Sequence, residues 1–181
     1  ISVLPAASDG SKRPAVAWQK YQTQLPTTDE VISWFKQGVD GIGVVTGAIS
    51  GNLEMLELEG RAVKSRMHLD IADIAASSGL GELWSRLNCG YVEVTPSGGI
   101  HWLYKVSGGK LPGNTKLARM PGENGGVDVF AETRSEGGWT ITAPSGGATH
   151  PSGGSWQLIG GGIENDHDGR ARGASCNLHT L

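Results

Sequence analysis

The sequence is poor in the features that mark several large protein classes. Its 181 residues include only two cysteines, Cys89 and Cys176, which stand far apart and outside any Cys-x-x-Cys pair. This spacing excludes a disulfide-dense scaffold and indicates no structural zinc site. No apolar run approaches the roughly 18 residues that a membrane span needs, and the first residues do not resemble a secretion signal. We therefore expect a cytoplasmic protein that does not contact a membrane.

Charge is also sparse and nearly balanced. Charged residues make up 18% of the chain, and 15 basic against 18 acidic side chains give a formal net charge of -3. Because many nucleic-acid-binding proteins are strongly basic, a polyanion would have to meet a local basic groove here. With 38% hydrophobic residues, the chain is too apolar for disorder and has the length of one domain. Ile1 stands where a complete product would begin with Met, so we expect either a piece of a longer protein or a chain whose first residues are missing.

Glycine and proline are abundant, with 29 and 8 residues, and predict many turns. Apolar periodicity predicts an α+β fold, with a mostly antiparallel sheet and helices packed on one face. Residues 1–159 are expected to form the domain, and the polar segment 160–181 is expected to be a linker or tail. Helices are predicted after Pro14, after Thr27 (with Glu30 at capping-box spacing), over 62–77 and over 82–87. Strands are predicted over 41–47, 53–59, 91–95, 100–106, 127–132 and 139–144, the last two as a hairpin.

Two acidic residues stand two apart in the predicted strand LEMLELE (53–59). In a strand, Glu57 and Glu59 leave the same face of the sheet, while Leu56 and Leu58 point into the core. Two converging carboxylates form a site suited to a hard divalent cation. A solvated strand face is the alternative interpretation of the same pattern.

A third carboxylate is predicted from the segment VDVFAE (127–132), in which acidic and apolar residues alternate. Asp128 then lies on a polar face of the sheet. If this strand lies beside the strand that carries Glu57, three carboxylates meet in an arrangement that two-metal enzymes use on phosphates.

A glycine-rich loop, TPSGG (95–99), precedes a strand on which His101 and Lys105 share a face. Glycine lets backbone amides approach a ligand closely, so the loop would cradle a phosphate while the two basic side chains supply positive charge. A plain hairpin turn explains the glycines equally well, and a hydrogen-bonded structural histidine explains His101. The predicted nucleotide-binding residues are Ser97, Gly98, Gly99, His101 and Lys105.

In their order, these segments resemble the bifunctional DNA primase/polymerase (Prim-Pol) domain of the archaeo-eukaryotic primase superfamily. The resemblance covers most of the chain: the lead-in SKRPAVAW is followed by GIGVVTGAISGNLEMLELEG, TPSGGIHWLYK and GVDVFAETRSEGGWTITAPS. One such motif alone would be weak evidence for the family, but three motifs in the same order and at fitting spacing are specific evidence for it. The resemblance implies an RNA-recognition-like catalytic core beside an N-terminal αβ unit.

The resemblance also implies a function, template-dependent addition of nucleotides to a primer 3′-hydroxyl in phage or plasmid replication. In that family the paired acids of the first motif and the acid of the third bind two Mg²⁺ or Mn²⁺ ions, and the histidine contacts the phosphates of the incoming nucleotide. Expected partners are single-stranded or primed DNA, a dNTP or NTP, and a fused or associated helicase. The implied catalytic residues are Glu57, Glu59, Asp128 and His101, with the three acids as metal ligands. Candidates for a basic template track are Lys12, Arg13, Lys116, Arg119 and Arg134.

The sequence departs from this family in two respects. The first motif usually reads Asp-x-Asp, whereas both acids here are Glu, which is one methylene longer and would alter metal spacing or the preference between Mg²⁺ and Mn²⁺. The zinc-binding segment of some superfamily members also has no counterpart in this sequence.

Two other functions fit the same residues. A metal-dependent nuclease would use clustered carboxylates and a histidine on phosphodiesters. A non-catalytic module would bind single strands or nucleotides by stacking on aromatic side chains such as Trp102, Tyr104 or Trp139. On the expected alternation Trp102 and Tyr104 face away from His101, which weighs against the binding module.

Overall fold

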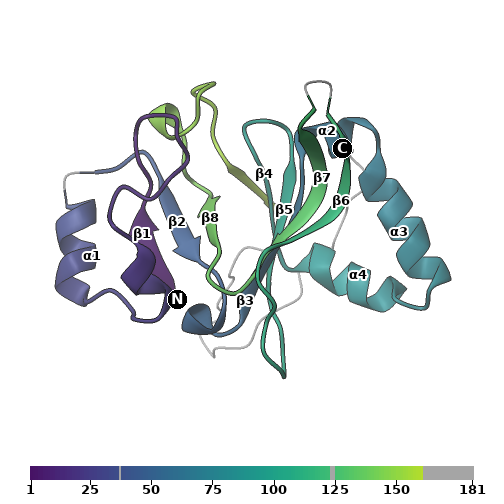
Figure 1. Ribbon diagram of the computed structural model, residues 1–181, viewed down its shortest axis with the longest axis horizontal. Helices are drawn as coiled ribbons and strands as arrows, with labels where there is room; N and C mark the ends of the chain where they lie inside the picture. The colour runs from purple at the N-terminus through teal and green to yellow at the C-terminus, as the bar shows by residue number, and fades with distance from the viewer. Residues whose placement is uncertain (37, 123–124, 161–181) are drawn as a thin grey trace.

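The computed structural model describes residues 1–36, 38–122 and 125–160. Over these ranges the chain is an α+β protein with two antiparallel sheets, as the sequence predicts (Figure 1). None of the helices in these ranges is long and apolar enough to cross a membrane. Of the predicted tail, residues 161–181 lie outside the described part, and Gly160 is the last residue of a strand.

The smaller sheet has the strand order β1-β2-β8. Its strands are β1 (Ser2–Pro5), β2 (Ile42–Val45) and β8 (Trp139–Thr142), and both pairs are antiparallel. The predicted helix after Pro14 is reduced to the short 3-10 helix η1 (Gln19–Gln22), because Pro14 instead forms an isolated β-bridge with Ala6, the residue after β1.

Helix α1 (Thr28–Phe35) begins at the capping box that the sequence predicts. The backbone N–H of Glu30 donates to the Thr27 hydroxyl (3.2 Å), and the backbone N–H of Thr27 donates to Glu30 Oε2 (2.8 Å). Lys20 Nζ and Tyr21 Oη of η1 donate to the other carboxylate oxygen, at 2.9 and 2.7 Å. The same side chain thus caps α1 and fastens it to η1.

The larger sheet has six antiparallel strands in the order β6-β7-β3-β5-β4-β9. Four of them match predicted strands: β3 (Leu53–Leu58), β4 (Tyr91–Val94), β5 (Ile100–Lys105) and β7 (Val127–Arg134). The other two, β6 (Thr115–Pro121) and β9 (Gln157–Gly160), were not predicted, because their largely exposed residues show no apolar alternation.

The predicted hairpin of the last two strands is wrong. β7 pairs with β3 and β6 of the larger sheet, whereas β8 pairs with β2 of the smaller one. The backbone N–H of Gly138 donates to Ser135 O, and the Thr46 hydroxyl, at the end of β2, donates to the same carbonyl. The turn therefore passes the chain from one sheet to the other.

Three helices pack on one face of the larger sheet, as predicted, and Figure 1 shows them on the side away from the smaller sheet. The predicted helix over 62–77 is interrupted at Arg66, whose φ of 66° is left-handed. The helices are α2 (Gly60–Lys64), α3 (Met67–Ser77) and α4 (Gly81–Cys89). They cover a core made of Leu58, Ala62, Val92, Ile100, Trp102 and Ala131.

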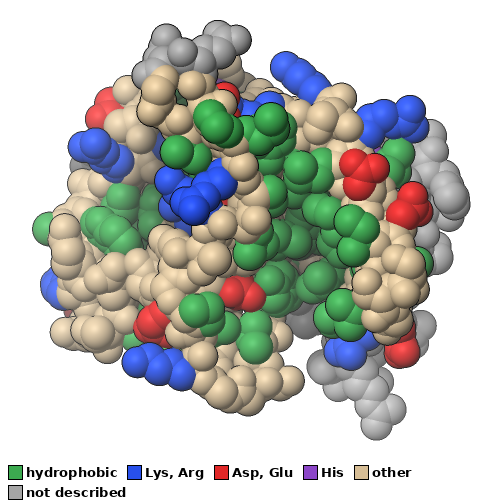
Figure 2. Space-filling view, turned by 45° about the vertical axis from the view of Figure 1, so that its right-hand side comes forward, with side chains coloured by type: hydrophobic (Ala, Val, Ile, Leu, Met, Phe, Trp, Pro, Cys, Tyr) green, Lys and Arg blue, Asp and Glu red, His purple; other side chains and the backbone are tan. Residues whose placement is uncertain are grey.

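Hydrophobic side chains also gather on the surface that α3, α4 and β6 present (Figure 2). Exposed apolar residues here come from α3, from the start of α4 and from the β6–β7 hairpin, so the helices leave an apolar surface beside this edge of the sheet. They are Leu69, Ile74, Leu80, Leu83, Leu117, Met120 and Val127.

Replacing Glu30 by Gln should lower the Tm by a few degrees at neutral pH, because Gln keeps the shape but loses the accepting charge. Hydrogen bonds from Thr27, Lys20 and Tyr21 lower the pKa of Glu30 from 4.5 to about 2. The difference in Tm between the native protein and the variant should be complete above a pH of about 4.5 and should vanish as the pH falls toward 2. Thermal melts of both proteins across this range measure it, and a Tm difference that does not vary with pH would contradict it.

Candidate metal and nucleotide site

Four ionisable side chains form a row across the larger sheet. The strand register sets Glu132 of β7 opposite Glu57 of β3, Glu57 opposite His101 of β5, and His101 opposite Glu93 of β4. Directly opposed residues of antiparallel strands share a face and lie side by side. Trp102, next to His101, packs in the helix-covered core, so the row lies on the other face, toward the smaller sheet.

Three carboxylates converge at one end of this row. Glu57, Glu59 and Glu132 each offer an oxygen atom, and these atoms all lie within 4.8 Å of one another. The sequence predicts that Glu57 and Glu59 converge, and the structure brings them together. Glu59 is not a strand residue, however, but the N-cap of α2, directly after β3.

Asp128, the predicted third carboxylate, lies outside this cluster and forms an ion pair with Arg61. The expectation that β7 lies beside β3 is correct, but the register sets Glu132, not Asp128, opposite Glu57. Asp128 lies four residues before Glu132 on β7, which corresponds to about 13 Å of extended strand. Glu132 therefore takes the place that the sequence analysis gave to Asp128.

The cluster concentrates negative charge in a partly buried place. Burial and the charge of Glu57 raise the pKa of Glu59. Burial likewise raises the pKa of Glu132, with a further contribution from the other two carboxylates that Arg134 partly offsets. A divalent cation that prefers oxygen ligands fits this set of donors, because it would relieve the repulsion among them.

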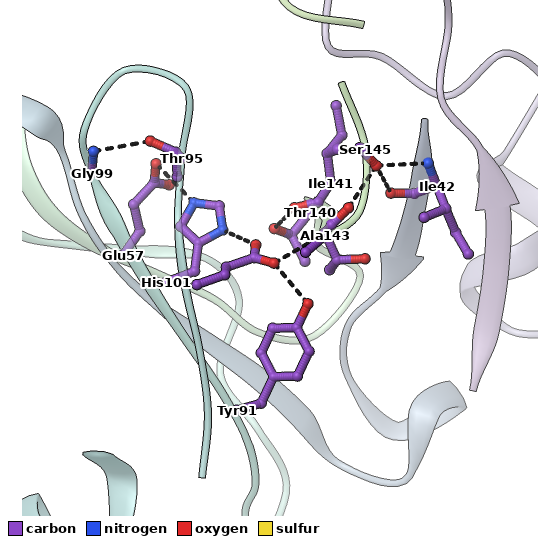
Figure 3. A network of polar contacts seen from close by, with 12 residues as sticks. Ile42, Glu57, Tyr91, Thr95, Gly99, His101, Thr140, Ile141, Ala143 and Ser145 are labelled. Atoms are coloured by element: carbon purple, nitrogen blue, oxygen red, sulfur yellow. Dashed lines mark hydrogen bonds and ion pairs between the residues drawn. The ribbon is translucent and has the colours of Figure 1, made fainter. Parts of the chain in front are cut away.

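His101 lies between two carboxylates, and only 6% of its side chain is exposed (Figure 3). Its Nε2 is 3.3 Å from Glu57 Oε1, and its Nδ1 is 2.8 Å from Glu93 Oε1. Burial alone would lower the pKa of His101, but the hydrogen bonds to both glutamates raise it to about 9. The ring is therefore positively charged at neutral pH, and Nε2 must leave Glu57 before it can make the predicted phosphate contact.

The positive charge of His101 acts on its neighbour in the cluster. Burial would raise the pKa of Glu57, yet the hydrogen bond and the charge of His101 outweigh burial and lower it. Glu57 thus stays ionised in a place where a lone carboxylate would tend to take up a proton.

The glycine-rich loop is a tight turn between β4 and β5. The Gly98 N–H donates to Thr95 O (2.9 Å), and the Gly99 N–H donates to Thr95 Oγ1 (3.0 Å). Gly98 has a φ of 77°, which suits the left-handed last position of a three-residue hairpin loop. Both amides are used inside the turn, so the predicted cradle of backbone N–H groups does not form.

Two glycines allow the loop to lie directly on the junction between β3 and α2. A Cβ atom on Gly60 would come within 2.1 Å of Ser97 O, and one on Gly99 within 2.6 Å of Leu58 O. This close approach of two backbones sets Ser97 beside the segment that carries Glu59.

The Ser97 hydroxyl has a partner that the sequence analysis missed, His150. The Ser152 N–H donates to His150 Nδ1 (3.1 Å), so the proton of the neutral ring lies on Nε2, which is 3.2 Å from Ser97 Oγ. Burial, with the nearby charge of Lys12, lowers the pKa of His150 and favours this neutral form. Ser97 Oγ then accepts from the ring and keeps its own hydrogen for another acceptor.

Several of these groups line a cleft of about 340 Å³ between the two sheets. Glu57, Glu59 and His101 lie on the wall formed by the larger sheet. Residues of β8 form part of the opposite wall. The remaining polar and aromatic lining residues include Lys12, Ser97, Asn114, Arg134, His150, Trp18, Trp139 and Trp156.

The predicted basic residues divide between the cleft and other places. Lys12 and Arg134 line the cleft, and Arg134 also forms an ion pair with Glu132. Lys116 and Arg119 lie on β6, the edge strand of the larger sheet. Arg13 is exposed and does not line the cleft.

Lys105 is not brought to the site. It pairs with Leu53 at the far end of β5, and its Nζ lies near Gly51. The prediction placed it correctly on the face of His101, but four residues of strand separate the two side chains by about 13 Å.

No protein-family model matches this chain, and no curated protein is significantly similar to it.

The geometry predicts that Glu132, and not Asp128, would be the third ligand of a metal ion bound at this cluster. Glu132→Gln should weaken Mn²⁺ binding about tenfold or more, because one of three oxygen donors loses its charge. Asp128→Asn, a matched change on the same strand, should leave Mn²⁺ affinity within about twofold. Titration followed by electron paramagnetic resonance measures both. A loss of affinity in the Asp128 variant but not in the Glu132 variant would overturn this assignment.

Proposed function

We propose that this chain is a metal-dependent nucleotidyltransferase, a DNA primase/polymerase that adds nucleotides to a primer 3′-hydroxyl on a DNA template. The observation that carries the proposal is the convergence of Glu57, Glu59 and Glu132, of which the first two line a cleft that also holds cationic and hydroxyl groups. Carboxylates that collect divalent cations beside donors for phosphate oxygens are what phosphoryl and nucleotidyl transfer require.

The order of the central strands supports the proposal. β3 and β4 are connected by α2, α3 and α4, and both pair antiparallel with β5, which lies between them. β7 pairs with the other side of β3. This split β-α-β arrangement is what an RNA-recognition-like core would have.

The three clustered glutamates would hold the metal. Bound Mg²⁺ or Mn²⁺ would supply the positive charge that activates the 3′-hydroxyl and stabilises the α-phosphate and departing pyrophosphate. The longer Glu side chains reach a common point from a strand, an N-cap and a neighbouring strand, which explains how Glu can replace the Asp-x-Asp of the family. His101 keeps Glu57 ionised for this purpose.

Other lining residues would bind the nucleotide and the template. Ser97 offers a hydroxyl hydrogen to a phosphate oxygen, since His150 already donates to its oxygen. Lys12 and Arg134 supply positive charge in the cleft, and we propose them as contacts to the triphosphate or the template backbone. The partners on this proposal are primed or single-stranded DNA and a dNTP or NTP, and the enzyme would work in the cytoplasm, with a helicase as a fused or associated partner.

A primer-extension assay tests the proposal directly. A 5′-labelled primer on a single-stranded template overhang is incubated with dNTPs and either Mg²⁺ or Mn²⁺. The native chain should lengthen the primer, and the Glu57→Gln/Glu59→Gln variant should be slower by roughly a hundredfold or more, because it loses metal-binding charge.

Glu54→Gln is the matched control for this assay. Glu54 lies on the same strand, but it accepts hydrogen bonds from Tyr104 and Ser135 outside the carboxylate cluster, so its variant should keep activity. Shortened primers would instead identify a nuclease. Template binding without any change in primer length, in either metal, would identify a binding module.

A further inference from the structure

Glu93 is a fully buried carboxylate at the far end of the ionisable row. It lies on β4 and has 0% of its surface exposed. Its Oε1 is 2.8 Å from His101 Nδ1, and its Oε2 accepts from Tyr91 Oη (2.7 Å) and from the Ala143 backbone N–H (2.7 Å) (Figure 3). The Tyr91 hydroxyl and the Ala143 N–H are donors to it, and the His101 ring donates to it when Nδ1 carries a proton.

Burial of such a group has a cost that its surroundings must offset. An ionised carboxylate is strongly disfavoured away from water unless it is paired and hydrogen-bonded. Here the His101 ring, a tyrosine hydroxyl and a backbone N–H surround both oxygens. Each of these partners comes from a different element of the fold, so together they fix the orientation of the carboxylate.

One of these donors comes from the end of a strand of the smaller sheet. Ala143 directly follows β8, and β8 residues Thr140 and Ile141 line the cleft opposite the carboxylate cluster. Tyr91 and His101 belong to the larger sheet. Glu93 therefore joins the backbone of one cleft wall to the histidine on the other wall.

We propose that Glu93 is a positioning residue that fixes the orientation of the His101 ring beside Glu57 and couples it to the seating of β8 against the larger sheet. With Nδ1 held by Glu93, the ring has one orientation, and Nε2 is directed to Glu57 and the cleft. The role of Glu93 in orienting the ring does not depend on the proposed function. Only the expected effect on nucleotide use rests on it.

If Glu93 only stabilised the fold and did not orient the ring, its role would be the same as that of Glu54. Glu54 is also a carboxylate of the larger sheet that accepts from a tyrosine, Tyr104, and from Ser135, which directly follows β7. Among the described residues, its hydrogen-bond partners do not include the histidine. Glu54→Gln is therefore a matched control that perturbs a similar polar contact without touching the His101 ring.

Long-range ¹H–¹⁵N spectra of the full chain report the His101 ring directly, with signals assigned by comparison with His101→Gln. The native protein should show a proton on Nδ1 at low field that exchanges slowly with solvent. In Glu93→Gln this proton should exchange at least about tenfold faster, while Glu54→Gln should leave it unchanged. The inference is overturned if Glu93→Gln folds and retains the native signal.

The spectrum of the native protein tests the contact between His101 and Glu93 even if Glu93→Gln does not fold. An Nδ1 without a proton in the native protein cannot donate to Glu93, and that result would also overturn the inference. Tyr91→Phe gives a further comparison, because it removes a donor from the other oxygen of Glu93 and should leave the Nδ1 proton in place.

Primer extension separates this inference from the proposed function. Glu93→Gln should lower kcat/KM for dNTP by roughly 10- to 100-fold, mostly through KM, because outer partners that orient a site residue have effects of this size. Glu54→Gln should not change KM. If the native chain does not extend primers at all, the proposed function fails, while the spectra still confirm or overturn the role of Glu93.

Discussion

The site depends on one buried contact, the imidazole of His101 held between Glu57 and Glu93. Three carboxylates and this one ring form a row across four neighbouring strands, and the ring supplies the positive charge among them. Without it, Glu57 would lie partly buried beside two further carboxylates and would tend to become neutral. A neutral Glu57 is a poor ligand for a hard cation, so the histidine keeps the cluster in the charge state that metal binding needs.

The layered fold makes this row possible. Helices α2, α3 and α4 bury the apolar face of the larger sheet, so its other face is free to carry polar groups. The smaller sheet lies opposite that face (Figure 1). Residues of both sheets line the cleft. Gly60 and Gly99 let the β4–β5 loop lie on the β3–α2 junction, which sets Ser97 beside the acids. The same strands thus supply the apolar core on one face of the sheet and the site residues on the other.

Local patterns in the sequence predicted the parts of the site that lie close together along the chain. The Glu57 and Glu59 pair and the strand of His101 follow from alternation, as the helix cap of α1 follows from its spacing. Glu132 was missed because the register of β7 against β3 joins distant segments, and no local pattern sets it. Glu93 had a usable signal, since a hairpin closed by a three-residue loop places it opposite His101. His150 comes from a loop whose position depends on how the sheets pack.

The most direct test of this account is the location of bound metal. Crystals of the full chain grown with Mn²⁺ and measured at a wavelength where manganese scatters anomalously would show each ion as a peak. The account predicts a peak among the carboxylate oxygens of Glu57, Glu59 and Glu132, on the cleft side of the larger sheet. A protein saturated with Mn²⁺ but without a peak there, or with its peak at Asp128, would contradict it.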